Sequence, residues 1–200
     1  LNDTDKRFIK KVINTHANTT KLTTGTLLSG MKGSGKTLMA KQIAVDSKLP
    51  IIVVDQSVPA SEIEGFFAKV TDNVCIIFDE VDKYWSTRYM LGFFDGVKPS
   101  CKKLVICTCN DEKEIDEYLN DRCSRIRYKK RFECLTKDAV IGILSDILTD
   151  KEKAKSAAEF VYNNISVISY DNIIMFGEEV RNNASESYES ILEDMNIEKK

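Results

Sequence analysis

The chain has 200 residues, of which 29 are Lys or Arg and 31 are Asp or Glu, so its formal net charge is −2 at pH 7. A chain of this length can form one medium domain, or one domain with a small appendage, and can complete its core without disulfides or a structural metal. The near balance of charge excludes a global positive field that would attract nucleic acid or an anionic membrane, although a local basic patch is compatible with it.

The cysteine pattern indicates free thiols in a reducing compartment. The six cysteines, at positions 75, 101, 107, 109, 123 and 134, form no C-x-x-C pair, and the single His cannot complete a usual Cys-His zinc site. We therefore expect a cytoplasmic protein. No run approaches the roughly 20 apolar residues of a membrane helix, so we expect no membrane partner. Because the chain begins at Leu1 rather than Met, the lack of a targeting peptide carries no weight.

The first elements in chain order are a helix, a polar link and a short strand. Apolar residues from Phe8 to Ile13 repeat at helical spacing among Lys and Arg, which predicts a helix over residues 4–14. A link rich in Thr and Asn then covers residues 14–24. The apolar run 26–28 predicts the first strand.

A glycine-rich loop, GMKGSGKT, follows at residues 30–37. It matches the pattern G-x-x-x-x-G-K-[ST], in which glycines let backbone N–H groups point at phosphate oxygens. In this pattern Lys36 reaches the β- and γ-phosphates and the Thr37 hydroxyl binds Mg²⁺, while the next helix directs its positive end at the anion. We therefore expect a nucleoside triphosphate as the ligand. The residues expected to contact it are Gly30, Met31, Lys32, Gly33, Ser34, Gly35, Lys36, Thr37 and Leu38.

Apolar strands and helix-forming segments alternate in the next hundred residues. Such alternation, with continuous apolar strands, is typical of an α/β fold whose parallel sheet is covered by helices. The expected strands cover residues 51–55, 74–80, 103–110 and 124–128, and the expected helices cover residues 37–47, 59–70 and 84–95.

The character of the sequence changes near residue 133. From Leu135 onward the strand signal nearly vanishes, and apolar residues recur at four-residue steps. We therefore expect three parts: an N-terminal helix and linker (1–23), an α/β nucleotide-binding domain (24–133), and a helical domain with a charged tail (134–200).

The strand expected at 74–80 ends in two acids. In open parallel sheets ligands bind at the carboxyl ends of the strands, so Asp79 would lie beside the phosphate loop and could hold Mg²⁺ through water. Glu80 could then act as the general base that polarises the attacking water. The alternative is a strand that ends in a solvated acidic turn. We expect Asp82 to be a supporting or helix-capping acid rather than a catalyst.

These segments resemble the AAA+ ATPase family, from about Thr24 to Arg131 and more loosely to about Ala184. The segment TLLSGMKGSGKTLMAKQIA is similar to the family's Walker A segment, CIIFDEVDKYW to its Walker B segment, and LVICTCND to its sensor 1 strand. The resemblance implies a P-loop NTPase core with a small C-terminal all-α lid. It also implies Mg²⁺-dependent hydrolysis of ATP, self-association into a ring or arc, and action on a macromolecular partner.

The resemblance further implies roles for three polar residues. Asn110 would be the sensor 1 residue that orients the lytic water, with a helix N-cap as the alternative. YLNDRCSRIRY is similar to the segment that carries the arginine finger, which implies Arg122, with Arg125 in reserve, acting on a neighbouring subunit's triphosphate. MFGEEVRNN is similar to the sensor 2 segment, which implies that Arg181 reaches the γ-phosphate from the lid. For all three arginines the alternative is a solvated surface position.

The sequence does not specify the macromolecular partner. Segment 56–73 is shorter than the insertion that carries an aromatic pore loop in protein-threading members, and we expect Phe66 and Phe67 in the core. The basic run 125–131 indicates either a charged edge strand or a contact with a phosphate backbone. Three functions therefore stay open: a remodeller of protein assemblies, a nucleic-acid-associated ATPase similar to clamp loaders or initiators, and an ATP-dependent scaffold with little turnover.

Overall fold

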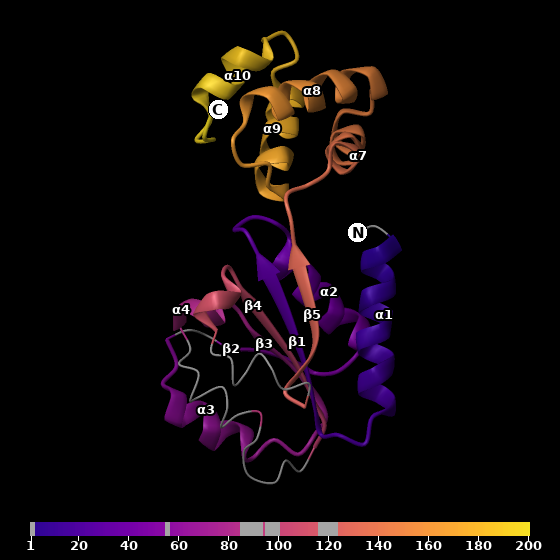
Figure 1. Ribbon diagram of the computed structural model, residues 1–200, viewed down its shortest axis with the longest axis vertical. Helices are drawn as coiled ribbons and strands as arrows, with labels where there is room; N and C mark the ends of the chain where they lie inside the picture. The colour runs from indigo at the N-terminus through magenta and orange to yellow at the C-terminus, as the bar shows by residue number, and fades with distance from the viewer. Residues whose placement is uncertain (1–2, 55–56, 85–93, 95–100, 116–123) are drawn as a thin grey trace. The chain divides into compact units, whose positions relative to one another are not determined.

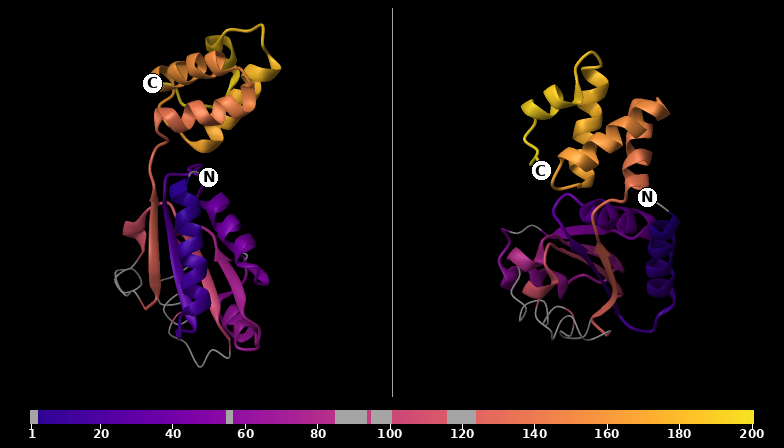
Figure 2. Two further views of the ribbon diagram at one scale, coloured as in Figure 1. Left: turned by 90° about the vertical axis from the view of Figure 1, so that its right-hand side faces the viewer. Right: turned by 45° about the horizontal axis from the view of Figure 1, so that its top comes forward.

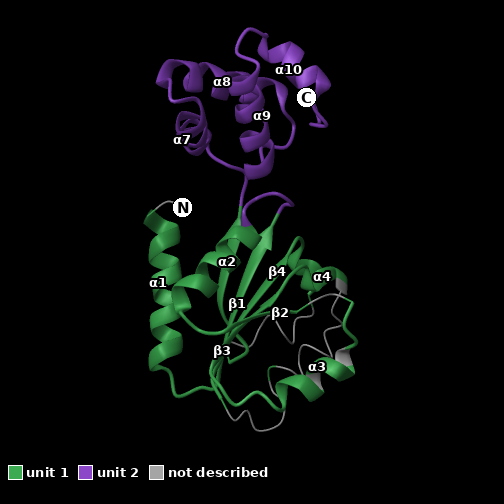
Figure 3. Cartoon of the chain, turned by 180° about the vertical axis from the view of Figure 1, so that it is seen from behind, with its two compact units in different colours: residues 1–30, 36–132 green, residues 31–35, 133–200 purple. Residues whose placement is uncertain are grey.

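The computed structural model describes residues 3–54, 57–84, 94, 101–115 and 124–200 (Figure 1). The chain divides into two compact units, one of residues 1–30 and 36–132 and one of residues 31–35 and 133–200 (Figure 3). Among the described residues, no helix combines the length and the apolar character needed to cross a membrane.

The first unit is built on a five-stranded parallel sheet, which confirms the predicted α/β fold. The strands are β1 (Thr23–Gly30), β2 (Ile51–Val54), β3 (Val74–Phe78), β4 (Lys103–Cys109) and β5 (Ile126–Phe132). Their order across the sheet is β2-β3-β4-β1-β5. Every residue of the central strands β3 and β4 is buried. This explains why β3 is a continuous apolar run in the sequence and why β4 is apolar from Leu104 to Cys107.

Helices cover both faces of this sheet (Figure 2). On one face α1 (Asp3–Asn18) and α2 (Lys36–Ser47) bury Val12 and Ile43 against residues such as Ile106. On the other face α3 (Ala60–Phe67) and α4 (Val81–Tyr84) bury Phe67 and Val81 against the remaining strand residues. The alternation of side chains along each strand therefore feeds two cores, one on each face. A short 3₁₀ helix, η1 (Glu112–Glu114), follows β4.

Several predicted elements differ from those observed. The fifth strand covers Ile126–Phe132 rather than 124–128, because β5 is an edge strand on which Lys129 and Arg131 can face solvent. β1 is also longer than predicted, because it pairs with β4 from Thr23 onward. Most of the helix predicted at 84–95 lies outside the described residues. Phe67 is buried as predicted, but the prediction for Phe66 is wrong, since that side chain is 54% exposed.

The second unit is a helical cluster. Its helices are α7 (Lys137–Leu148), α8 (Lys151–Asn164), α9 (Tyr170–Asn182) and α10 (Tyr188–Asp194). Each begins after a residue whose side-chain oxygen accepts a hydrogen bond from a backbone N–H in the first turn, which stabilises the helix start. The capping residues are Thr136, Asp150, Ser169 and Ser187. The aromatic rings of Phe160, Phe176 and Tyr188 contact one another in its core. These C-terminal helices are the all-α part that the sequence predicts.

Candidate functional site

The glycine-rich loop uses backbone conformations that favour glycine. Gly30, Gly33 and Gly35 have φ angles of 136°, 73° and 94°. Side chains are rarely tolerated at such angles, so the loop depends on glycine at these three positions. The Ser34 Oγ atom is buried and has no hydrogen-bond partner among the described residues. A buried hydroxyl without a partner fits a site that receives a polar ligand such as a phosphate oxygen.

In the second unit this loop contacts the start of α9. The backbone N–H of Asp171 donates to the Gly33 carbonyl over 3.3 Å. A Cβ on Gly33 would lie 3.0 Å from Ser169 Oγ and 3.1 Å from Asp171 Oδ2. A side chain at Gly33 would therefore be tightly packed against the start of α9, in addition to the strain of the positive φ angle.

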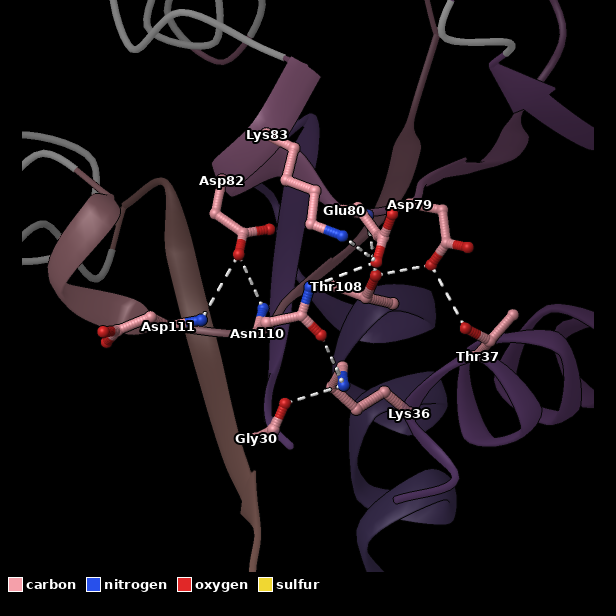
Figure 4. A network of polar contacts seen from close by, with 10 residues as sticks. All are labelled: Gly30, Lys36, Thr37, Asp79, Glu80, Asp82, Lys83, Thr108, Asn110 and Asp111. Atoms are coloured by element: carbon pink, nitrogen blue, oxygen red, sulfur yellow. Dashed lines mark hydrogen bonds and ion pairs between the residues drawn. The ribbon is translucent and has the colours of Figure 1, made fainter. Parts of the chain in front are cut away.

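Lys36 begins α2 in the first unit and turns its ammonium group toward the sheet (Figure 4). Its Nζ donates to the Gly30 carbonyl over 2.7 Å and to Asn110 Oδ1 over 3.1 Å. The residue is only 6% exposed, and this burial lowers the pKa of the Lys36 ammonium, while Cys109 and nearby carboxylates such as Asp82 act in the opposite direction. The fold therefore holds a desolvated cation at the end of the glycine-rich loop.

Asp79 immediately follows β3 and lies between two hydroxyl groups (Figure 4). Thr37 Oγ1 donates to Asp79 Oδ1 over 3.2 Å, and Thr108 Oγ1 donates to the same oxygen over 2.5 Å. Carboxylate and hydroxyl oxygens are hard ligands of the kind that Mg²⁺ prefers. Thr37 and Asp79 therefore fit a magnesium ion, and they come from the two elements that the sequence predicts.

Glu80 has an unusual backbone and a well-defined side chain. Its φ of 51° is left-handed, which is costly for a residue with a Cβ and is typical of functional sites. Its Oε1 accepts from Lys83 Nζ over 2.8 Å and from Asn110 Nδ2 over 3.1 Å. Its backbone N–H donates to Thr108 Oγ1 over 2.9 Å. The carboxylate is thus held next to the amide of Asn110.

Asp82 fixes the chain just after β4. Its Oδ2 accepts from the backbone N–H groups of Asn110 and Asp111, over 2.9 and 3.3 Å. Its Oδ1 is buried without a hydrogen-bond partner among the described residues. Asp82 therefore acts as a supporting acid, and it holds the segment that follows β4 rather than capping a helix. The N-cap of η1 is Asp111, so the alternative of Asn110 as a helix N-cap is wrong.

A comparison with known protein families identifies the family of this chain. Residues 26–131 match the family described as "ATPase family associated with various cellular activities (AAA)". The chain belongs to the AAA family of ATPases. Membership brings with it a P-loop ATPase core and a nucleotide as the family's ligand.

Individual proteins resemble this AAA ATPase over different lengths. An Arabidopsis thaliana protein named "ATP-dependent zinc metalloprotease FTSH 2, chloroplastic" is 38% identical over 85 residues, which are 38% of this chain and 12% of that protein. The RuvB Holliday junction branch migration motor of Thermotoga maritima has a TM-score of 0.72 at 14% identity, covering 96% of this chain and 68% of that chain. A mutant form of the same RuvB gives a TM-score of 0.75, also at 14% identity, over 99% of this chain and 71% of the other. The RuvB likeness shows the fold alone.

Two of the three predicted arginines lie within the part of the chain that the structure describes. Arg122 lies outside the described residues. Arg125, just before β5, is only 6% exposed. Arg181 is exposed in the last turn of α9, and the helix rise of about 1.5 Å per residue puts it roughly 15 Å along the axis from the turn that contacts Gly33.

Sequence reasoning missed two members of the network around the acids, Thr108 and Lys83. Thr108 is hard to recognise, because a hydroxyl within the apolar run of β4 looks like an ordinary β-branched strand residue. One signal was present: Thr108 stands two residues before Asn110, at the carboxyl end of a central strand where ligands bind. Lys83 stands one helical turn after Glu80, a spacing at which side chains meet.

Proposed function

We propose that this AAA ATPase binds ATP with Mg²⁺, hydrolyses the γ-phosphate, and works as an oligomer that couples turnover to the remodelling of a macromolecular partner. One observation supports this most strongly: Asn110 hydrogen-bonds on one side to Lys36 and on the other to Glu80. A phosphate-binding cation, a polar amide and a carboxylate base in series are the groups that such a hydrolysis requires.

Binding would use the loop and the start of α2. The loop from Gly30 to Leu38 would hold the phosphates, with Lys36 providing the positive charge. The Thr37 hydroxyl would ligate Mg²⁺, and Asp79 would hold the ion directly or through water. The distance of 3.2 Å between Thr37 Oγ1 and Asp79 Oδ1 allows one ion to bind both side chains. Bound Mg²⁺ would neutralise charge on the β- and γ-phosphate oxygens.

Hydrolysis would use the other end of the network. Glu80 would accept the proton of the attacking water as general base. Asn110 would orient that water through its amide, because it already shares a hydrogen bond with the Glu80 carboxylate. Lys36 would stabilise the negative charge that develops on the γ-phosphate.

A neighbouring subunit would supply the remaining positive charge. Because Arg125 is buried, Arg122 is the better candidate for an arginine that acts in trans. Members of the AAA family usually oligomerise, which supports this arrangement. Arg181, exposed in the last turn of α9, would reach the γ-phosphate from the C-terminal helices, as its resemblance to sensor 2 implies.

The Glu80→Gln variant tests the proposed chemistry. It should keep ATP binding and lose turnover by about 10²–10⁴-fold, because the amide cannot take the proton. Glu62→Gln, at an exposed position of α3, is the matched control and should hydrolyse ATP normally. Normal hydrolysis by Glu80→Gln would refute the assignment of the base.

Light scattering tests the proposed assembly. The protein should form a larger species with a non-hydrolysable ATP analogue than with ADP, because a trans arginine contacts the γ-phosphate only when it is present. Arg122→Ala should remove the difference while leaving nucleotide binding in place. An identical mass in both nucleotides would argue against the ring or arc. Assembly with ATP but without appreciable turnover would favour a nucleotide-dependent scaffold instead.

A second function, in which the partner is nucleic acid, is favoured by β5. Arg127, Lys129 and Arg131 are exposed on this edge strand, which makes a local basic stripe. DNA or RNA should then stimulate turnover, and Lys129→Glu should remove the stimulation. Lys130 is a poorer probe, because its Nζ pairs with Asp5 Oδ1 at 2.7 Å and its reversal would also disturb α1. No stimulation by either nucleic acid would leave protein remodelling as the proposed function.

A further inference from the structure

One threonine of β4 touches both acids of the proposed site (Figure 4). Thr108 is fully buried, and its hydroxyl donates to Asp79 Oδ1 over 2.5 Å. The same hydroxyl oxygen accepts the backbone N–H of Glu80 over 2.9 Å. A hydroxyl has one donor hydrogen and two acceptor lone pairs, so it can make both contacts at once. One side chain of β4 therefore hydrogen-bonds to two consecutive residues, Asp79 and Glu80, which follow the neighbouring strand β3.

A second buried threonine shows that this arrangement is not a general property of the sheet. Thr26 lies on the adjacent strand β1 and is as fully buried as Thr108. Its Oγ1 has no hydrogen-bond partner among the described residues. Thr26 therefore fills space in the sheet, whereas the hydroxyl of Thr108 has two defined partners.

The contact between Thr108 and Glu80 matters because Glu80 has an unfavourable backbone conformation. The left-handed φ of 51° is disfavoured for any residue with a Cβ and persists only where surrounding contacts hold it. Thr108 holds the N–H side of Glu80, while the Glu80 carbonyl accepts the Lys83 N–H over 3.0 Å as α4 begins. This turn directs the Glu80 carboxylate at Asn110. Releasing the N–H would let the backbone relax toward a commoner conformation and move the carboxylate away.

We propose that Thr108 is a positioning residue, whose hydroxyl holds the Asp79 carboxylate for metal binding and the Glu80 carboxylate for proton abstraction in one fixed geometry. This inference rests on the proposed ATP hydrolysis and names the residue that aligns it. In this role Thr108 would act through its two hydrogen-bond partners, Asp79 and Glu80, rather than on the reacting atoms.

Substitutions at Thr108 separate the hydroxyl from the shape of the side chain. Thr108→Val keeps the β-branched shape and removes both hydrogen bonds. At saturating Mg²⁺ it should lower kcat roughly 10- to 100-fold and change KM for ATP little, because misplacing a catalytic group costs rate rather than ground-state binding. Thr108→Ser retains the hydroxyl and should recover most of the activity. Thr26→Val, the matched control, should leave kcat unchanged.

A binding measurement gives a readout that does not depend on turnover. In calorimetry with a non-hydrolysable ATP analogue, Thr108→Val should require a higher Mg²⁺ concentration than the wild type, by roughly 10- to 100-fold, because residues that orient a metal ligand contribute to metal affinity by that factor. Thr108→Ser should show the Mg²⁺ requirement of the wild type. If Thr108→Val does not fold, the pair Thr108→Ser and Thr108→Ala isolates the hydroxyl in a smaller side chain, with the loss expected only in Ala.

The outcomes separate this inference from the proposed function. If Glu80→Gln loses turnover but Thr108→Val matches the wild type in kcat and Mg²⁺ requirement, the positioning role is overturned and ATP hydrolysis stands. If the wild type neither binds nor hydrolyses ATP, both proposals fail. A loss of activity in Thr108→Val that Ser does not restore would also overturn the role, because packing rather than the hydroxyl would then be responsible.

Discussion

The Lys36 ammonium donates a hydrogen bond to the amide oxygen of Asn110 over 3.1 Å. The amide nitrogen of the same Asn110 donates to Glu80 Oε1 over 3.1 Å, so both ends of the amide are used. Its orientation is thereby fixed, since only the oxygen can accept from an ammonium and only the nitrogen can donate to a carboxylate. Asn110 therefore connects the part of the network proposed to bind phosphate with the part proposed to activate water.

Removal of this amide should affect turnover more than binding. We expect Asn110→Ala to lower kcat about 10²-fold, because the water and Glu80 would lose their fixed geometry, while ATP affinity stays close to that of the wild type. Steady-state kinetics with a parallel binding titration provide the measurement. Asn182→Ala, an exposed position at the end of α9, is the matched control. A variant that loses affinity and keeps kcat would place Asn110 in ground-state binding instead.

The buried His16 should make stability depend on pH. His16 Nδ1 lies 3.1 Å from Thr24 Oγ1, and burial, followed by the charge of Lys102, lowers the His16 pKa below its usual 6.5. Above pH 6.5 the side chain is neutral in both states. Below it the unfolded chain binds a proton that the folded chain does not, so the free energy of unfolding should decrease as the pH falls from 6.5 through the folded-state pKa.

Urea unfolding at a series of pH values measures this effect. His16→Asn, which can keep a polar contact with Thr24 but does not titrate, should lose less stability than the wild type between neutral and mildly acidic pH. Equal losses in the two proteins would show that His16 does not carry the pH dependence. The Lys102→Gln variant should reduce the loss in part, because the charge of Lys102 is the second cause of the shift.

Two glycines in the helices of the second unit should respond in opposite ways to Ala. At Gly177 in α9 a Cβ would lie 2.8 Å from Leu144 Cδ2 and 3.0 Å from Ile147 Cδ1, both in α7. At Gly142 in α7 a Cβ would meet nothing within 4 Å. Gly142→Ala should stabilise the protein by roughly 0.5–1 kcal/mol through helix propensity. Gly177→Ala should be less stable than Gly142→Ala by about 1–3 kcal/mol because of overpacking. Chemical denaturation of both variants would show the order, and equal stabilities would mean that α7 and α9 can separate at little cost.

Much of the fold follows from patterns that act locally. Apolar runs predict the buried strands β3 and β4. The glycines of the phosphate-loop pattern predict the positive φ angles observed in the loop. The placement of β5 does not follow in this way. Alternating charged residues such as Lys129 and Arg131 lower the apparent strand signal, and only the position of β5 at the sheet edge explains why they are tolerated.

The candidate site likewise has residues that the sequence predicts and residues that it does not. The predicted neighbours Asp79 and Glu80 are consecutive in the sequence, and the rule for parallel sheets brings Asn110 to the same edge. The Thr108 hydroxyl could not be assigned, because its two partners depend on the register of β3 against β4. The role of Arg181 rests on a segment resemblance, and the structure adds only that this residue stands in the last turn of α9.

Binding of Mg²⁺ and ATP, compared between the wild type and Lys36→Ala, tests the central claim most directly. Isothermal titration should show saturable uptake of magnesium nucleotide by the wild type and by Lys41→Ala, whose side chain is exposed on α2, and none by Lys36→Ala. Lys36→Ala should still fold, because burial already disfavours the Lys36 charge and its removal relieves that cost. A folded wild-type protein that takes up no magnesium nucleotide, or a Lys36→Ala variant that binds it as well as the wild type, would contradict the account.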